Sequence, residues 1–355
     1  MNNTQSPAMT ATASNNQLRL WLLACAALVF CMIVLGGVTR LTNSGLSIVE
    51  WKPVSGILPP FTAEAWDAEF SKYQQYPEFQ KVNHRMTLDE FKGIFWLEYW
   101  HRVLGRVIGI VFFVPLVLFA WQRKLDRRLL THLGLLLVIG ACQGYMGWFM
   151  VKSGLVDNPR VSHYRLTLHL AMAVILYTYL LFLALGQGAP RTPRLASHQR
   201  GLFRYAGAVT ILVVVMILSG GLVAGTRAGF IYPTFPRMGE HWLPPEVYAT
   251  TPAWLAAFED MATIQFNHRL LAVVVFVACA ALAIKVFRSG VGGRLAIAAH
   301  LMMALLLTQV TLGILTLVLH VPVSLAASHQ GVAILLYTSL VYLTLASRPG
   351  RGVAP

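Results

Sequence analysis

The chain has 355 residues, of which 56% are hydrophobic and only 12% are charged. Its mean hydropathy of +0.61 excludes an ordinary soluble globular protein. Long continuous apolar runs alternate with shorter polar segments, which favours membrane-spanning helices over a β-barrel, whose strands would alternate apolar and polar residues.

The apolar runs predict an all-α polytopic membrane protein with eight transmembrane helices. The expected spans are 20–38, 95–121, 129–151, 166–185, 205–224, 264–286, 295–319 and 325–346. Residues 1–17 are polar and put no basic segment ahead of the first span. We therefore expect a disordered tail over 1–19 and no cleavable signal.

The basic residues predict the orientation of the spans. If the N-terminus lies inside, the inner segments carry 14 of the 28 basic residues but only one of the 14 acidic ones, Asp126. This asymmetry follows the positive-inside rule and predicts that both chain ends are cytoplasmic. It also explains the net charge of +14 through topology and contact with membrane lipid, so no nucleic-acid partner is needed.

The loops on the outer side are longer than the basic inner connections. The first, 40–94, carries aromatic residues that suit a lid at the membrane surface: Trp51, Trp66, Tyr73 and Tyr76. The third, 226–263, is rich in proline and aromatic residues. We therefore expect the functional machinery near the outer face.

The two halves of the chain repeat the same polar residues in the same order. The matched residues are Gly36 and Gly220, His101 and His268, Gln143 and Gln309, Gly147 and Gly313, and His169 and His329. Four spans in each half give both halves the same orientation, so we expect two pseudo-symmetric four-helix bundles related by an axis along the membrane normal. The expected halves are 20–187 and 205–346, joined by a basic inner linker at 188–204 and followed by a tail at 347–355.

A polar stretch stands at the head of the second span. The apolar run 107–121 is too short to cross a bilayer, so the span must reach back over Arg106, Arg102 and His101. Ionisable groups at that depth usually face a bundle interior or a cofactor. The second half carries the matching residues Gln265, His268 and Arg269 ahead of the run 270–284.

Four histidines fall near the outer ends of even-numbered spans, one pair in each half. They are His101 and His169 in the first half, and His268 and His329 in the second. A structural hydrogen bond is the plain alternative for any single one, but four in a repeated pattern favour metal ligation. Facing histidines on two helices of a bundle can hold one haem iron, whereas zinc would want a carboxylate or thiolate nearby. We therefore expect all four to be iron ligands.

Arginines ring the same outer ends. They are Arg40, Arg102, Arg106, Arg227 and Arg269. Guanidinium groups pair well with carboxylates, so we expect Arg102 and Arg106 near a haem in the first half and Arg269 near one in the second. For Arg40 and Arg227, lipid phosphate is an equal alternative.

The halves differ three residues before the first histidine of each pair, where one has Glu98 and the other has Gln265. A glutamine can only orient and hydrogen-bond, whereas a buried glutamate can also accept and deliver protons. We therefore expect a reactive site in the first half, with Glu98, His101 and His169 as its catalytic residues, and an electron-transfer haem in the second. An ion pair between Glu98 and Arg102 is the structural alternative.

Several stretches together resemble the haem A synthase family, in the type found in mitochondria and alphaproteobacteria. They are 36–46, the segment 73–95 with its Tyr-x-x-x-Pro-Glu-Phe-Gln-Lys-Val-Asn run, Glu98-Tyr-Trp-His-Arg102, Gln265-Phe-Asn-His-Arg269 and His329-Gln330. Two features depart from the family: the outer-loop cysteine pair of its other type is absent, and Tyr232-Pro-Thr-Phe-Pro-Arg237 replaces the usual Tyr-Asn-Thr-Phe-Pro-Leu.

The resemblance implies a membrane oxidoreductase of haem biosynthesis that oxidises the C8 methyl of haem O to a formyl group, giving haem A for cytochrome oxidase. The first site would hold the haem O substrate on His101 and His169. The second would hold haem b, with its iron, on His268 and His329, beside Gln265 and Arg269. The family implies a bacterial inner membrane, sites near the periplasmic face, a haem O synthase as supplier and cytochrome oxidase assembly factors as partners.

Two other classes of protein fit part of the pattern. A non-catalytic di-haem b-type electron carrier would use the same histidines, although haems stacked across both leaflets would suit it better. A transporter would explain the parallel repeat but leave the His-Arg pairs idle. The sequence leaves open whether the electron donor is a ferredoxin or a quinol, whether the chain forms a homo-oligomer, and whether oxygen binds the substrate iron.

Overall fold

The structure is a computed structural model that describes residues 7–52, 56–186, 197–290 and 293–348. Its elements are all helical apart from one isolated β-bridge between Met238 and His241. In chain order they are α1 (Pro7–Leu41), α2 (Ala63–Gln74), α3 (Pro77–Lys81), α4 (Leu88–Trp121), α5 (Arg127–Lys152), α6 (His163–Gly186), α7 (Ser197–Thr226), the 3-10 helix η1 (Ala228–Phe230), α8 (Ala253–Glu259), α9 (Met261–Arg288), α10 (Arg294–Val318) and α11 (Val323–Ala346).

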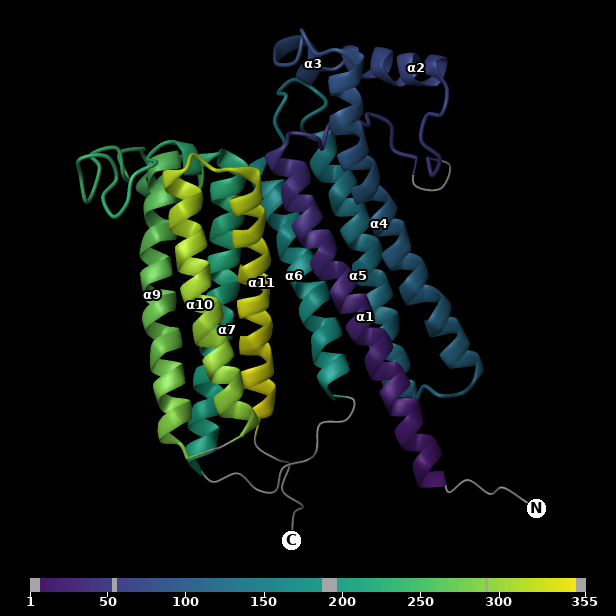
Figure 1. Ribbon diagram of the computed structural model, residues 1–355, viewed down its shortest axis with the longest axis vertical. Coiled ribbons are helices and arrows are strands. Elements are labelled where there is room, and N and C mark those ends of the chain that lie inside the picture. Colours follow the sequence, from purple (N-terminus) through teal and green to yellow (C-terminus); the bar gives the residue numbers. More distant parts are fainter. Residues whose placement is uncertain (1–6, 53–55, 187–196, 291–292, 349–355) are drawn as a thin grey trace.

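Eight of these helices are long and apolar enough to cross a membrane, which confirms the expected multi-pass architecture. They are α1, α4, α5, α6, α7, α9, α10 and α11. The helices form two groups of four that stand side by side, with α1, α4, α5 and α6 in one and α7, α9, α10 and α11 in the other (Figure 1). Each group follows one half of the sequence. Helices α1, α6, α7 and α11 make the contacts between the groups.

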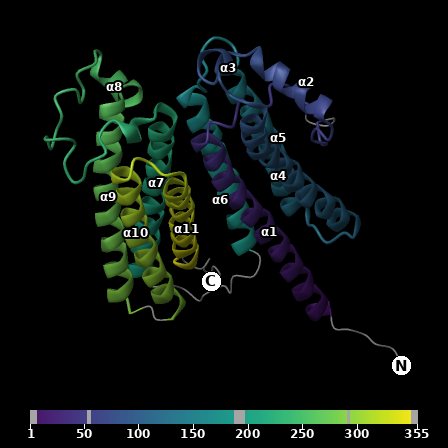
Figure 2. The ribbon, with the colours of Figure 1, turned by 45° about the horizontal axis from the view of Figure 1, so that its top comes forward.

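The short helices of the two long loops lie at one end of the molecule. Helices α2 and α3 cover the end of α4, and α8 lies at the same end over the second half (Figure 2). We call this the outer end. Helix α1 starts, and α11 finishes, at the opposite end (Figure 1). An even number of spans places both ends of the chain on the same side.

The polar residues at the helix starts explain why two spans begin well outside their apolar runs. Thr87 caps α4 by accepting a hydrogen bond from the Glu90 backbone N–H, and the Glu90 carboxylate accepts one from Thr87 N–H at 2.7 Å, which makes a capping box. Asp260 caps α9 by accepting from Thr263 N–H at 2.7 Å. These caps let each helix carry polar residues for several turns before it becomes continuously apolar.

The two halves meet through a reciprocal pair of hydrogen bonds between α6 and α11. The Tyr177 hydroxyl lies 2.7 Å from Thr338 Oγ1, and the Tyr337 hydroxyl lies 2.6 Å from Thr178 Oγ1. Each Tyr-Thr pair begins eight residues after a histidine of the repeat. The pseudo-two-fold axis therefore passes between α6 and α11 at this level.

The segments expected to lack structure are partly helical. Helix α1 begins at Pro7, so residues 7–19, which we expected to be disordered, continue the first span as a helix. The expected linker 188–204 overlaps α7, which begins at Ser197. Residues 1–6, 187–196 and 349–355 lie outside the described residues.

Candidate functional site

Each of the four predicted histidines lies toward the outer end of its span. His101 is on α4, His169 on α6, His268 on α9 and His329 on α11. In the first half, α4 and α6 both pack against α1 and α5, so they lie diagonally across their bundle. In the second half, α9 and α11 both pack against α7 and α10 in the same way. Both pairs therefore come from diagonal helices of a four-helix bundle.

A glycine on a neighbouring helix lies against each imidazole. A Cβ added at that glycine would come within 2.8 to 3.5 Å of the imidazole Cε1, which is at or inside van der Waals contact. The pairs are Gly36 with His101 at 3.1 Å, Gly147 with His169 at 3.2 Å, Gly220 with His268 at 3.5 Å and Gly313 with His329 at 2.8 Å. The repeated glycines thus provide the space in which the repeated imidazoles lie.

The two histidines of each pair are close enough to interact electrostatically: His169 acts on His101, and His329 acts on His268. All four are only partly buried. A ring that lies against a glycine at its Cε1 atom and retains some exposure is suited to bind an external ligand.

The ring nitrogens are bonded differently in the two halves. In the first half, the buried Nδ1 atoms of His101 and His169 have no hydrogen-bond partner among the described residues. In the second half, His268 Nδ1 lies 3.1 Å from Ser219 Oγ, and His329 Nδ1 lies 3.1 Å from the Gln309 carbonyl oxygen. A bond of this kind fixes the orientation of a metal-bound imidazole. The second pair is thus held more firmly than the first.

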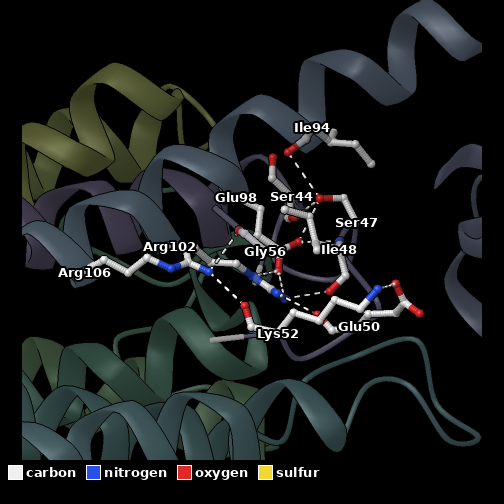
Figure 3. Close-up of polar contacts among 10 residues, drawn as sticks. All are labelled: Ser44, Ser47, Ile48, Glu50, Lys52, Gly56, Ile94, Glu98, Arg102 and Arg106. Carbon is white, nitrogen blue, oxygen red and sulfur yellow. Dashed lines mark hydrogen bonds and ion pairs between the residues drawn. The ribbon is translucent and has the colours of Figure 1, made fainter. Parts of the chain in front are cut away.

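Glu98 lies one turn above His101 and is 3% exposed. Its carboxylate accepts hydrogen bonds from Ser47 Oγ at 2.7 Å and from Ile48 N–H at 2.8 Å. It also forms an ion pair with Arg102 Nη2 at 2.7 Å. Figure 3 shows these contacts converging on the start of the long outer loop. The carboxylate therefore joins α4 to that loop.

Arg102 and Arg106 continue the same attachment (Figure 3). Arg102 donates to the carbonyl oxygens of Ile48 at 2.6 Å and Glu50 at 2.8 Å. Arg106 Nη2 donates to the carbonyl oxygens of Lys52 and Gly56, each at 3.0 Å. Both guanidinium groups thus bind loop backbone.

The second half repeats the attachment with a neutral side chain. Gln265 Nε2 donates to the Ala228 carbonyl oxygen at 2.9 Å, and Arg269 Nη2 donates to the Tyr232 carbonyl oxygen at 2.9 Å. Arg269 Nη2 also donates to Gln265 Oε1 at 3.3 Å. The structure therefore favours, for Glu98 and Gln265 alike, a role in holding an outer loop above a histidine.

Comparison with known proteins establishes the family. The sequence profile of the family described as cytochrome oxidase assembly protein matches residues 19–341, a range that contains all four histidines. The chain belongs to this family. Proteins named haem A synthase are similar along almost the whole chain: that of Nitrosospira multiformis is 47% identical over 93% of both chains, and that of Nitrosomonas eutropha is 45% identical over 94% of both. The haem A synthase of Rhodospirillum centenum is 45% identical over 96% of this chain and 90% of its own.

The family-like segment 73–83 forms a hydrogen-bonded group that the sequence did not assign to any function. Tyr73 donates to the Glu78 carboxylate at 3.1 Å and accepts from Asn83 Nδ2 at 2.8 Å. Glu78 is 6% exposed. Its burial raises the pKa of the carboxyl group to about 7; the Tyr73 hydrogen bond opposes the rise, and the negative charge of Glu98 adds to it. The spacing in this segment was visible in the sequence, but its hydrogen bonds and its proximity to Glu98 were not.

Several further contacts of the site also escaped the sequence. Ser219 and the backbone of Gln309 orient the second pair, and the Gln143 side chain donates to the His169 carbonyl oxygen at 3.1 Å. The repeat pointed to the two glutamines and to the glycines that face the imidazoles, although not to what they contact. No pattern in the sequence pointed to Ser219.

Proposed function

We propose that this protein is a haem A synthase: an oxidoreductase that converts the C8 methyl of haem O into the formyl group of haem A. The observation that carries the proposal is that similarity to proteins of that name extends over nearly the whole chain, including both histidine pairs and the glycines facing them. Two successive hydroxylations, each a two-electron oxidation of the carbon that needs an external oxidant such as oxygen, would give a geminal diol, and loss of water from the diol would give the aldehyde.

The residues of both halves fit a haem. Each pair offers two imidazoles from diagonal helices, and both rings of the first pair have a buried Nδ1 without a hydrogen-bond partner among the described residues. His101 and His169 would hold the haem O substrate, and His268 and His329 would hold haem b. Haem b supplies one-electron chemistry and would pass electrons to the substrate site.

The difference in hydrogen bonding supports this division of roles. Ser219 and Gln309 orient the second pair, as suits a resident cofactor whose geometry stays fixed. The first pair lacks such bonds at Nδ1, as suits a site that must accept a substrate and release a product. Glu98 holds the outer loop over the first site, and we further propose that it handles protons there.

The function implies a location and partners. We place the protein in the bacterial inner membrane, with the outer end facing the periplasm, because the basic residues gather in the segments at the opposite end. A haem O synthase would supply the substrate, a ferredoxin or a quinol would supply electrons, and the product would go to cytochrome oxidase assembly.

Extraction of pigment from the purified protein tests the function. Haem O or haem A together with haem b is the expected result, because the substrate or product should remain in the first half. Extraction of haem b alone, with no haem A formed when haem O, a reductant and oxygen are added, would instead favour an electron carrier. His→Ala variants at each of the four positions should remove pigment from one half at a time.

A Glu98→Gln variant separates proton handling from attachment of the loop. With its oxygen toward Ser47 and Ile48, glutamine keeps those two hydrogen bonds and loses the ion pair with Arg102, whose guanidinium still donates to the carbonyl oxygens of Ile48 and Glu50. We expect bound haem to be retained, the outer loop to stay resistant to protease, and haem A formation to fall by about 100-fold or more. Haem A formed at the normal rate would show that Glu98 only holds the loop.

A further inference from the structure

We propose that Arg40 and Arg227 form an anion-binding site between the two halves at the outer end, which takes the carboxylate or phosphate of a membrane amphiphile. The two arginines occupy matching positions of the repeat, at the ends of the first and fifth spans. The structure brings them close enough for their positive charges to repel one another.

The repulsion is poorly compensated. Among the described residues, the Arg40 guanidinium has no hydrogen bond or ion pair, although Arg40 is partly buried. Arg227 donates to the neutral Asn43 side chain at 2.6 Å. The carboxyl group of Glu78 is close enough to interact with Arg227, and its own raised pKa leaves it partly neutral near pH 7. Two guanidinium groups in this setting would be stabilised by an anion between them.

The neighbouring arginines are already engaged. Arg102, Arg106 and Arg269 all donate to carbonyl oxygens of the outer loops. Arg40 differs from them, because its guanidinium donates no hydrogen bond within the described part of the chain, and Arg227 donates to a neutral side chain, that of Asn43.

The backbone at this place is strained. Arg227 and its partner Asn43 both have positive φ angles, of 61° and 52°, which side-chain-bearing residues rarely adopt. Strain of this kind persists where surrounding contacts hold it and is frequent at ligand sites. From this position the Arg227 side chain reaches the first half, where it donates to Asn43.

The position selects an amphiphile. Arg40 lies in the last turn of α1, a helix long and apolar enough to cross a membrane, and we expect an arginine at such an end to lie near the lipid headgroups. Two sources share the required chemistry: a propionate of a porphyrin bound in either half, and the phosphate of a phospholipid. The porphyrin source rests on the proposed function, whereas the phospholipid source does not.

The test uses the purified full-length protein and its Arg40→Gln, Arg227→Gln and double variants. Arg85→Gln is the matched control, because Arg85 is an exposed arginine of the same outer loop. The first probe is iron protoporphyrin IX compared with its dimethyl ester, which lacks both carboxylates. The second is the amount of phospholipid that co-purifies with the protein, measured as phosphorus.

We expect the unaltered protein and the control to bind the diacid about tenfold or more tightly than the ester, and the double variant to lose that preference, if the anion is a propionate. If it is a phospholipid, the double variant should lose co-purifying phosphorus instead. Arg40→Lys with Arg227→Lys should restore part of either effect, which excludes misfolding as the cause.

The site is disproved if the double variant keeps both the diacid preference and the phosphorus content of the control. Haem A formation is measured in parallel. An unaltered protein that forms no haem A but shows the Arg-dependent binding would overturn the proposed function and leave the anion site standing.

Discussion

Each imidazole of the repeat faces a glycine on a neighbouring helix, and the absence of a side chain there lets the two helices come close together. The tightest case is Gly313, where an added Cβ would lie 2.8 Å from His329 Cε1 and 3.3 Å from its Nδ1. The ring cannot retreat freely, because Nδ1 is also held by the Gln309 carbonyl oxygen. At this position one methyl group is therefore enough to displace a candidate ligand.

We expect Gly313→Ala to lower the haem content of the second half several-fold while leaving the first half loaded. The control is Gly144→Ala on α5, where an added Cβ meets nothing within 4 Å and alanine favours the helix by up to about 1 kcal/mol. The haemochrome spectrum and the thermal midpoint of the two variants check this. Equal pigment in both would show that the glycine contact does not constrain His329.

Glu78 gives the outer loop a dependence on pH. Its pKa is raised from 4.5 to about 7 in the folded protein, so the folded state binds the proton more tightly than the unfolded state. The resulting stabilisation is complete below pH 4.5, declines as pH rises toward 7 and is lost above that. Its upper limit is roughly 3 kcal/mol.

We therefore expect protease cleavage of the outer loop to become faster between about pH 5 and pH 8. Glu78→Gln should remove this dependence, because glutamine stays neutral while keeping a carbonyl oxygen for Tyr73. Glu64→Gln, at an exposed position on α2, is the control and should behave as the unaltered protein does. Rates that follow pH equally in all three would rule out Glu78 as the titrating group.

The long helices show which features of the fold the pattern of apolar residues can predict. All eight spans could be predicted, because continuous apolar runs have few other solutions in a membrane. Their outer starts could not: α4 begins at Leu88 because the capping box at Thr87 and Glu90 continues it beyond its apolar run. Helices α2 and α3 were also missed, since their aromatic side chains find a core only when they pack on α4.

The residues of the candidate site could be predicted from the sequence, but their contacts could not. The repeat identified the histidines, the glycines and the Glu98/Gln265 difference. What Glu98 touches depends on residues about 50 positions earlier, in a loop without periodicity. Side chains that bind irregular backbone leave no spacing in the sequence, so the engagement of Arg102 and Arg106 with the loop could not be read from it.

The two loop attachments should respond differently to loss of their arginine. Arg102→Ala leaves Glu98 charged, buried and without its ion pair, which should cost about 3 to 5 kcal/mol and free the outer loop. Arg269→Ala leaves only the neutral Gln265, so its cost should be smaller, about 1 to 3 kcal/mol.

Thermal unfolding and limited proteolysis of the two variants measure the difference. The Glu98→Ala, Arg102→Ala double variant should be less damaged than the sum of its single changes, because the stranded charge is gone. Additive losses would mean that the two side chains act independently.

At the scale of the whole molecule, matching residues of the repeat make the contacts that join the two halves. Because Tyr177 and Tyr337 occupy matching positions and bond reciprocally, each hydroxyl should contribute a similar amount. We expect Tyr177→Phe and Tyr337→Phe each to cost about 1 kcal/mol of stability. Tyr145→Phe, at an exposed position on α5, should cost nothing measurable. Strongly unequal losses, measured by unfolding in detergent, would show that the interface is not pseudo-symmetric in energy.

The paired glycines of α1 and α7 connect the two bundles to each other. Gly36 faces His101 of its own half, while Gly37 faces Gln330, the residue after His329. On α7, Gly220 faces His268, while Gly221 faces Leu170, the residue after His169. A ligand that shifts α1 or α7 in one bundle therefore moves the surface on which the other bundle's histidine segment rests. If each histidine pair binds a ligand, we therefore expect binding at one pair to alter the affinity of the other, and linkage requires the influence to be equal in both directions.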